Sequence, residues 1–222
     1  MSKLVIAIDG PSGSGKSTTS KGVARALGLE YLDTGAMYRA VTVAFLDSGV
    51  DPGDTAGVVA ACTGARIEIS TDPDAEWVRV NGRDVTAEIR EQYVSQAVST
   101  VSTIPECRAD LVARQQAIIA AAKAGIVAEG RDITTVVAPQ AQVRILLTAD
   151  PEVRMARRKA DLGGDVDQAA LADQVLRRDR DDSKLVNFTQ AADGVIGLDC
   201  THLSLQETIA AVLDLAKGAQ PA

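Results

Sequence analysis

Near its N-terminus the chain reads Gly10-Pro11-Ser12-Gly13-Ser14-Gly15-Lys16-Ser17, which satisfies every position of the pattern G-x-x-x-x-G-K-[ST]. The apolar residues 4–8 before it predict a buried strand, and residues 16–27 after it predict a helix. In that setting glycines let the backbone wrap closely around phosphate oxygens, while successive N–H groups and the helix N-terminus point at the anion. The alternative is a glycine-rich turn with an incidental lysine. The flanking strand and helix favour a phosphate-binding loop, so we expect a nucleoside triphosphate as the ligand.

The loop also assigns chemical roles to its last residues. Lys16 is expected to reach the β- and γ-phosphate oxygens, and the Ser17 hydroxyl is expected to ligate Mg²⁺. The residues that we expect to hold the triphosphate are Gly10, Pro11, Ser12, Gly13, Ser14, Gly15, Lys16, Ser17 and Thr18.

Length and composition limit the remaining possibilities. At 222 residues with 46% apolar content, the chain has enough material for a single domain over residues 1–222 with a small insertion, but not for two full domains. Its formal net charge of -7 argues against nucleic acid or an anionic membrane as the main partner, because those ligands favour clustered positive surface. Any phosphate that it binds must therefore meet locally concentrated arginines.

The cysteines and the chain start indicate the compartment. Cys62, Cys107 and Cys200 are scattered and lack metal-ligand spacing, so we interpret them as buried or neutral thiols, as suits a reducing cytoplasm. The first predicted strand begins within three residues, which leaves no room for a signal peptide, and no apolar run has the length of a membrane helix. We expect a cytoplasmic protein. The single histidine, His202, is expected to be structural or exposed.

Strands and helices alternate over most of the chain. Strands are predicted at residues 29–32, 126–129, 143–148 and 194–198, and helices at 36–46, 105–124, from Pro151, from about 168, and from a Ser204 cap to about 216. Gly125 is expected to close the helix that Pro105 opens. This alternation around the loop predicts an α/β fold, a doubly wound parallel sheet that binds ligands at the carboxyl ends of its strands.

An insertion interrupts this pattern. Residues 66–70 and 77–80 alternate with period two, and Asn81-Gly82 is the strongest short hairpin signal in the chain. Short helical pieces follow at 86–90 and 92–99. We interpret about 63–102 as an inserted antiparallel subdomain in the α/β core.

Polar groups follow three other predicted strand or helix ends, in residues 33–39, 129–132 and the arginine-rich stretches at 157–158 and 177–184. Together they hold more cations than one triphosphate needs, so two phosphorylated ligands and phosphoryl transfer would account for them. Two alternatives stay open. An intrahelical ion-pair ladder explains the alternating charges after Arg177, and a solvated side chain explains Arg39 in the first turn of its helix, where an anionic ligand would otherwise favour it.

On these residues the chain resembles the bacterial cytidylate kinase family, also called (d)CMP kinases, over nearly its whole length. The resemblance rests on residues 8–17, on Asp33-Thr34-Gly35-Ala36-Met37-Tyr38-Arg39, on Glu129-Gly130-Arg131-Asp132 with residues 135–137, on residues 177–183 and on the antiparallel insertion. It implies a monomeric cytoplasmic enzyme that uses ATP and Mg²⁺ to phosphorylate CMP and dCMP. The insertion would then be the domain that binds the nucleoside monophosphate.

The resemblance also implies residue roles. Lys16, Arg131, Arg157 and Arg158 would be catalytic, the last two as arginines of a lid at about 154–165 with Gly163 and Gly164 as hinge. CMP would be held by Thr34, Tyr38, Arg39, Ser99, Arg108, Arg131, Asp132, Arg177, Asp181 and Lys184. Ser99, Arg108 and Asp132 would read cytosine, and Arg177 and Asp181 would meet the sugar.

Two residues depart from the family's pattern. Glu129 stands where many members have Asp, and Lys184 stands where an arginine usually completes the phosphate clamp. Lysine keeps the charge of that arginine but loses its bidentate fork.

Proteins of other classes share part of this pattern. A GTPase switch would need an Asn/Thr-Lys-x-Asp base-reading motif, which the sequence lacks. A shikimate kinase or another small-molecule kinase shares the loop but does not explain the insertion or Arg131-Asp132. A non-catalytic nucleotide-binding module is not distinguished by sequence.

Overall fold

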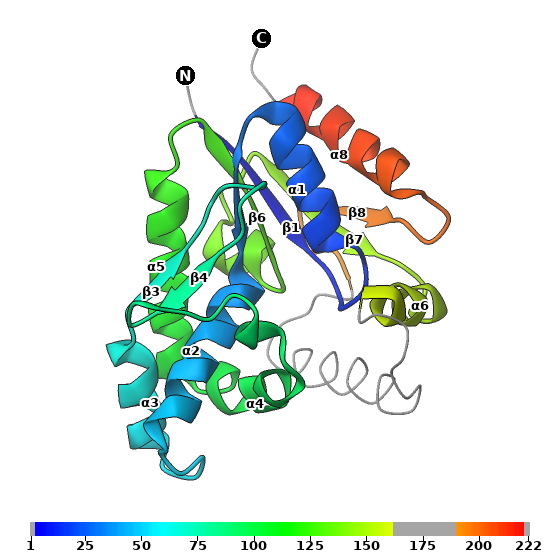
Figure 1. Cartoon of the computed structure of the whole chain (residues 1–222). Helices are drawn as coiled ribbons and strands as arrows, with labels where there is room; N and C mark the ends of the chain where they lie inside the picture. The colour runs from blue at the N-terminus through cyan, green and yellow to red at the C-terminus, as the bar shows by residue number, and fades with distance from the viewer. Residues whose placement is uncertain (1–2, 162–189, 220–222) are drawn as a thin grey trace. The chain divides into compact units, whose positions relative to one another are not determined.

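The phosphate-binding loop follows β1 (Leu4–Asp9), the central strand of a five-stranded sheet with the order β2-β6-β1-β7-β8 (Figure 1). This computed structural model describes residues 3–161 and 190–219. The other strands are β2 (Glu30–Asp33), β6 (Gly125–Gly130), β7 (Val143–Thr148) and β8 (Ile196–Asp199). β1 pairs in parallel with β6 and β7, and β7 pairs in parallel with β8. The predicted α/β fold with a parallel sheet is confirmed.

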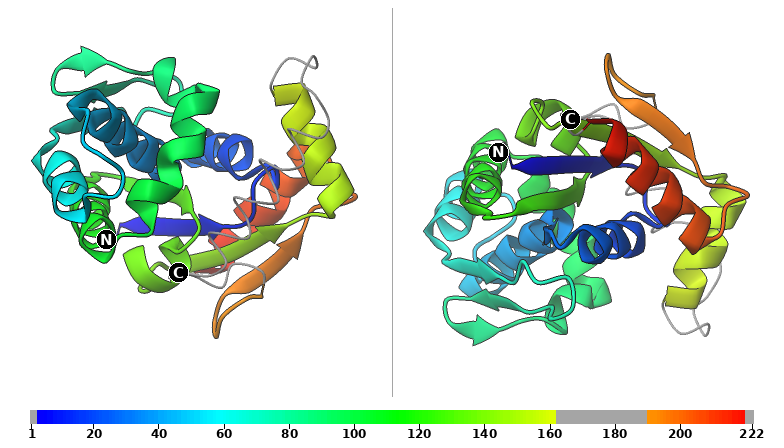
Figure 2. Two further views of the ribbon diagram at one scale, coloured as in Figure 1. Left: turned by 90° about the horizontal axis from the view of Figure 1, so that it is seen from below. Right: turned by 90° about the horizontal axis from the view of Figure 1, so that it is seen from above.

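Two compact units make up the chain, Met1–Tyr31 with Ala122–Ala222, and Leu32–Ala121. In the first unit, α1 (Lys16–Leu27) and α8 (Leu205–Ala219) lie side by side and pack on alternate residues of β1 and β7 (Figures 1 and 2). The core between them includes Ile6, Ile8, Val23, Ile145, Leu147 and Val212, each at most 1% exposed. This unit also contains η2 (Ile133–Val137), a single π-helical turn, and α6 (Pro151–Asp161).

The second unit contains four α-helices and a small antiparallel sheet. Its elements are α2 (Thr34–Ser48), α3 (Thr55–Gly64), β3 (Ile67–Ile69), β4 (Val78–Val80), β5 (Arg83–Asp84), the 3₁₀ turn η1 (Glu88–Arg90), α4 (Gln92–Ser102) and α5 (Pro105–Ala121). Asn81 and Gly82 have φ of 52° and 83°, the left-handed pair of a type I′ turn, and they join β4 to β5. The predicted antiparallel insertion at 63–102 falls inside this unit, which has a separate core around Ala40, Val80 and Val94.

Several predicted bounds match. The helix at 16–27 and the strand at 143–148 have the expected ends, and Gly28 closes α1 in the left-handed conformation. Ser204 and Glu207 cap α8 reciprocally, since each backbone N–H donates to the other side chain. The strands expected at 29–32 and 194–198 begin one and two residues later than predicted.

The predicted start of α2 was wrong, and this changes the interpretation of Arg39. The Asp33 carboxylate accepts a hydrogen bond from the Ala36 N–H at 2.8 Å, so the helix begins at Thr34 rather than Ala36. Tyr38 and Arg39 therefore lie in the second turn instead of the first. The helix-dipole reason for placing an anion near Arg39 loses its force.

The predicted end of α5 was also wrong. The helix stops at Ala121, and Gly125 is the first residue of β6 instead of a helix cap. Gly125 has φ of 123° and pairs with Leu4, and a Cβ on it would lie 2.2 Å from the Leu4 carbonyl oxygen. Close strand packing, which a sequence does not display, is the reason for this glycine.

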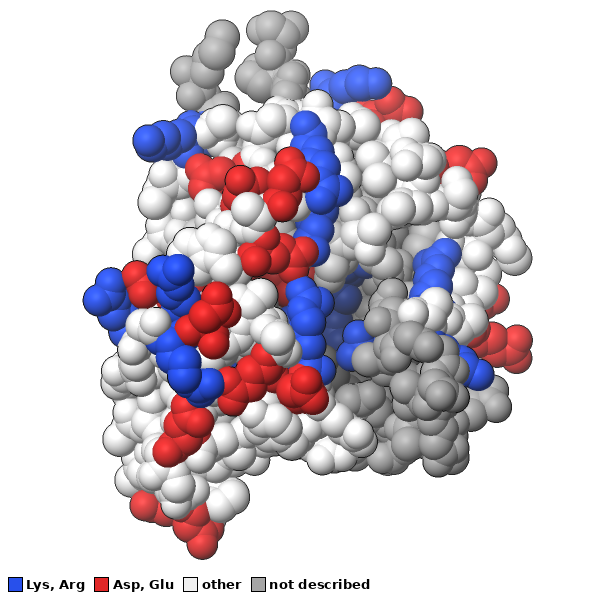
Figure 3. Space-filling model, in the orientation of Figure 1, with Lys and Arg blue, Asp and Glu red and all other residues white. Residues whose placement is uncertain are grey.

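Three elements were not predicted, namely α3, β5 and the π-helical turn η2. The helix predicted from about residue 168 and the Gly163-Gly164 turn lie outside the described residues. Among the described residues, no helix has the length and apolarity needed to cross a membrane. Basic and acidic side chains are interspersed over the face shown in Figure 3.

The cysteines were predicted to be buried or neutral thiols, and their burial is confirmed. Cys62, Cys107 and Cys200 are each 1% exposed and carry free thiols. Burial, followed by the neighbouring Cys107 thiol, raises the pKa of the Cys62 thiol to about 12. Burial also raises the pKa of Cys107.

Candidate active site

The phosphate-binding loop has a backbone that only glycine can form at two positions. Gly10 has φ of 155°, and a Cβ there would lie 2.1 Å from the Leu147 carbonyl oxygen. Gly13 has φ of 75°, and its Cβ would lie 2.4 Å from the Arg154 carbonyl oxygen. The loop therefore lies tightly against β7 and α6, and Gly15 leads it directly into the N-terminus of α1. This is the strand–loop–helix geometry that binds phosphate.

Two polar side chains of the loop, Lys16 and Ser14, are buried within it. Lys16 is 7% exposed, and its Nζ donates to the Pro11 carbonyl at 2.9 Å. The Ser14 hydroxyl is fully buried and has no hydrogen-bond partner among residues 3–161 and 190–219. A buried hydroxyl in a loop of this geometry fits a phosphate oxygen as its missing partner.

A hydroxyl and a carboxylate meet at the start of α1. Ser17 Oγ donates to Glu129 Oε1 at 2.6 Å, and the Tyr31 hydroxyl donates to the same oxygen at 3.3 Å. Glu129 is 4% exposed near the end of β6, the neighbour of β1. Hard oxygen ligands of this kind suit Mg²⁺, which typically takes one or two protein ligands beside substrate phosphates.

Of the arginines that the structure describes, three donate to carbonyl oxygens of the loop. Arg131 Nη1 donates to Gly10 at 2.5 Å, Arg154 Nη1 to Ser12 at 3.0 Å, and Arg157 Nη1 to Ser14 at 3.4 Å. Arg131 follows β6, and the other two lie on α6, one turn apart. The predicted cations Arg131 and Arg157 are thus brought to the loop.

Arg154 was missed as a site residue. The sequence signal was its position three residues before Arg157 on the same helix, which places both on one face. Arg158 follows on α6, while Arg157 is anchored further by a bond from Nη2 to the Cys200 carbonyl at 3.0 Å.

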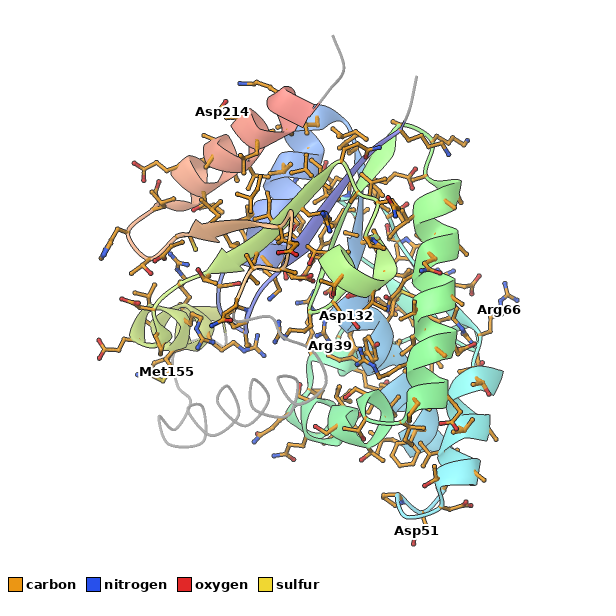
Figure 4. All side chains as sticks on the ribbon, turned by 180° about the vertical axis from the view of Figure 1, so that it is seen from behind. Arg39, Asp51, Arg66, Asp132, Met155 and Asp214 are labelled. Atoms are coloured by element: carbon orange, nitrogen blue, oxygen red, sulfur yellow. The ribbon has the colours of Figure 1, made fainter. Side chains whose placement is uncertain are left out.

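Asp9 is a second buried carboxylate that was not predicted as functional. Its Oδ1 accepts the Ile133 N–H at 2.9 Å, and its Oδ2 accepts the Thr134 N–H at 2.8 Å and the Thr134 hydroxyl at 2.6 Å. Burial raises the pKa of Asp9, and these hydrogen bonds and Lys16 oppose that rise. Asp132, predicted to read a base, is 4% exposed directly before these donors (Figure 4).

In the second unit, Arg39 on α2 is held by an acid (Figure 4). Its Nη2 lies 3.1 Å from Asp33 Oδ2, the carboxylate that also caps α2. Its buried Nε–H meets no acceptor within the part of the chain that the structure describes. Thr34 and Tyr38, also predicted to contact the acceptor, lie on the same helix.

The predicted base readers Ser99 and Arg108 lie on adjoining elements of this unit. Ser99 is near the end of α4, and Arg108 is in the first turn of α5, from which its Nη1 donates to the Ser102 carbonyl at 3.4 Å. Both side chains are partly exposed. Arg177, Asp181 and Lys184 lie outside the described residues.

The sheet order and the loop at the end of its central strand define a nucleotide-binding protein of the P-loop class. The family model described as cytidylate kinase matches residues 6–218. The cytidylate kinase of Cutibacterium acnes is 52% identical over 218 residues, covering 96% of each chain, and that of Streptomyces griseus is 46% identical over 98% of this chain and 94% of its own. The chain belongs to the cytidylate kinase family.

A third relative, the cytidylate kinase of Mycolicibacterium paratuberculosis, is 44% identical over 97% of this chain and 96% of its own. Among solved structures, a shikimate kinase from Acinetobacter baumannii in complex with shikimate aligns with 100% of this chain and 97% of its own, at 16% identity and a TM-score of 0.46. This likeness is too distant to bear on activity.

Proposed function

We propose that this chain transfers the γ-phosphoryl group of ATP to CMP or dCMP and releases ADP with CDP or dCDP. The observation that carries the proposal is the family match over residues 6–218. In the reaction an oxygen of the acceptor phosphate forms a bond to the γ-phosphorus, and the bond from that phosphorus to the β–γ bridging oxygen breaks. Such a transfer needs positioning and neutralisation of charge more than covalent help from the protein.

The loop residues Gly10 to Thr18 bind the ATP phosphates in this proposal. Lys16, Arg131, Arg157 and Arg158 act catalytically by supplying positive charge along the path of the transferred group. Support comes from the loop geometry and from the arginines that already lie against it. Arg154 joins this set because it donates to the same loop.

Mg²⁺ would be held through Ser17, with Glu129 beside it. The short contact between their oxygens supports this assignment. The bound ion supplies neutralisation of the ATP phosphates. The Tyr31 hydroxyl donates to the same Glu129 oxygen and helps to hold its side chain in place.

The residues assigned to the acceptor nucleotide are those that the resemblance to the family implies. Arg39 and Arg131 are proposed to bind its phosphate, and the unfilled Nε–H of Arg39 supports the first of these. Thr34 and Tyr38 join them, and Ser99, Arg108 and Asp132 read the base. Arg177, Asp181 and Lys184 complete the proposed set for the sugar and phosphate.

The base-reading proposal follows from hydrogen-bond chemistry. Cytosine offers acceptors at O2 and N3 and a donor at N4, so arginine donates to the first two atoms and aspartate accepts from the amino group. Uracil has a donor at N3 and an acceptor at O4, the reverse of cytosine at these two positions. Buried polar groups of the site would then be unpaired, at a cost of about 1–3 kcal/mol each. UMP should therefore be a poor substrate.

The remaining assignments are also proposals. The insertion at about 63–102 would serve the monophosphate, and residues 154–165 would form a lid that excludes water from the transfer. We place the enzyme in the cytoplasm as a monomer, in keeping with its free thiols.

An ADP-coupled assay with ATP, Mg²⁺ and a panel of nucleoside monophosphates tests the function. CMP and dCMP should give the highest kcat/KM, with UMP well below them. Arg108→Met should lower kcat/KM for CMP far more than for UMP, while Lys217→Met, at an exposed ion pair with Asp214, serves as the control. An unchanged CMP-to-UMP ratio in Arg108→Met would remove Arg108 from the base site. No turnover with any acceptor, despite ATP binding, would favour a non-catalytic nucleotide-binding module.

A further inference from the structure

The carboxylate of Asp9 joins two segments that are 124 residues apart in the sequence and have different proposed tasks. Asp9 ends β1 and directly precedes the phosphate-binding loop, whereas its three hydrogen-bond donors belong to Ile133 and Thr134. Those donors directly follow Arg131 and Asp132. Asp9 therefore holds the first residues of η2 at the end of its own strand.

A fourth hydrogen bond joins the same two segments, and its donor again belongs to the later one. Arg131 Nη1 donates to the carbonyl of Gly10, the residue after Asp9. Residues 9–10 thus accept four hydrogen bonds from residues 131–134. The acidic side chain, Asp9, belongs to the first segment, and the basic side chain, Arg131, belongs to the second. Arg131 and Asp132, the two residues proposed to contact the acceptor nucleotide, lie at the start of this hydrogen-bonded segment.

The burial of Asp9 makes these bonds matter. The residue is 2% exposed, and a buried carboxylate is costly unless its oxygens are hydrogen-bonded. Ile133, Thr134 and their neighbours would form a strand by propensity, yet they form a π-helical turn whose leading N–H groups are satisfied by Asp9. The carboxylate thus determines the local backbone that carries Arg131 and Asp132.

We propose that Asp9 is a positioning residue for the acceptor nucleotide, which acts by fixing the turn that carries Arg131 and Asp132. The proposal rests on the proposed function for the roles of those two residues. Removing the Asp9 carboxylate should weaken recognition of CMP more than binding of ATP. The reason is that its hydrogen-bond donors directly follow Arg131 and Asp132, the residues proposed to contact CMP.

Thr134 provides the sharpest test, since it gives two of the three bonds. Thr134→Val keeps the side-chain shape and the N–H but removes the hydroxyl bond to Asp9, and Thr134→Ser keeps that hydroxyl. Loss of a hydrogen bond to a charged acceptor corresponds to about a tenfold effect. Thr134→Val should therefore raise KM for CMP about tenfold with KM for ATP changed less than about twofold, and Thr134→Ser should restore KM for CMP.

Asp9→Asn and Thr208→Val complete the set. In Asp9→Asn an amide NH₂ faces a backbone N–H, so KM for CMP should rise more than in Thr134→Val, and the preference for CMP over UMP should fall. Thr208→Val is the matched control, because Thr208 is a buried threonine whose hydroxyl donates to Ser204 at the start of α8. It should leave both KM values unchanged.

Hydrogen exchange without substrate supplies a readout that does not depend on activity. Exchange in residues 130–137 should speed up in Asp9→Asn and Thr134→Val but not in Thr208→Val. Unchanged exchange there, or KM values for CMP and ATP that rise together, would overturn the positioning role. A wild-type enzyme that turns over no nucleoside monophosphate would instead defeat the proposed function, and with it the acceptor role of this turn, even if exchange responds as expected.

Discussion

Lys16 is almost fully buried, and its ammonium group donates to a carbonyl within its own loop. Arg131, Arg154 and Arg157 occupy three further loop carbonyls. The fold itself therefore gathers cationic side chains around the loop. Such preorganisation lowers the cost of reorientation when charge develops during phosphoryl transfer.

Lys16→Ala should lower kcat by about 10²–10³-fold, as expected for loss of one preorganised transition-state contact. The variant should still fold, since the hydrogen bond that it loses, to the Pro11 carbonyl, is worth about 1.5–3 kcal/mol, less than the usual stability of a domain. Steady-state kinetics and thermal unfolding check this. Lys217→Ala, at an exposed ion pair with Asp214 on α8, is the control and should keep wild-type kcat. Near wild-type turnover in Lys16→Ala would contradict the assignment.

Residue types alone could not identify every residue of the candidate active site. The sequence singled out Lys16 and Ser17 because their spacing from the glycines has one interpretation. It gave no reason to select Asp9, since a carboxylate at a strand end is ordinary until its three donors are seen. It also misplaced Arg39, whose ion pair with Asp33 depends on where α2 begins.

Among the elements, α8 shows how local sequence sets a boundary. Ser204 and Glu207 form a reciprocal cap, and hydrogen bonds from Ser204 hold the pKa of the Glu207 carboxyl below its usual value. Val212 and Ala216 on the same helix are buried against the sheet. The cap therefore fixes where a core-forming helix starts.

Ser204→Ala should lower the free energy of unfolding by about 1 kcal/mol, the usual effect of losing an N-cap oxygen. Ser204→Asp should retain most of the stability, because its carboxylate can accept the same N–H. Urea denaturation of the three proteins at neutral pH measures the differences. Equal losses in both variants would show that the cap oxygen is not the source of the effect.

η2 shows the opposite case, an element that local sequence misrepresents. Thr135, Val136 and Val137 are β-branched and favour strands. Their segment nevertheless turns, and the buried carboxylate of Asp9 accepts hydrogen bonds from the N–H groups of Ile133 and Thr134 at its start. A contact across more than 120 residues outweighs propensity here.

At the scale of the whole molecule, each unit has a hydrophobic core of its own. One core packs α1 and α8 on the parallel sheet, and the other packs α2 with the small antiparallel sheet. A ligand that binds one unit should therefore stabilise chiefly that unit, because local opening is governed by local contacts.

Hydrogen exchange with single ligands tests this expectation. Mg²⁺ with ATP should slow exchange in residues 10–27, while residues 55–80 keep their rates. CMP alone should slow exchange in residues 34–40 and 105–112 of the second unit, where Thr34, Arg39 and Arg108 lie. Equal protection throughout the chain by ATP alone would show that the two cores open as one.

The sequence by itself determined the loop, the helix and strand that flank it, and the parallel sheet, because these follow from local spacing and periodicity. Its motifs also carried the resemblance to one kinase family. The start of α2 is set locally by the Asp33 cap and was misjudged from the sequence. Only the tertiary structure decided the strand role of Gly125 and the turn at η2. Both depend on a group supplied from elsewhere in the chain or on a close approach of backbones. A hydrogen bond or a steric exclusion between distant residues leaves no period in the sequence, so it becomes visible only when the chain is folded.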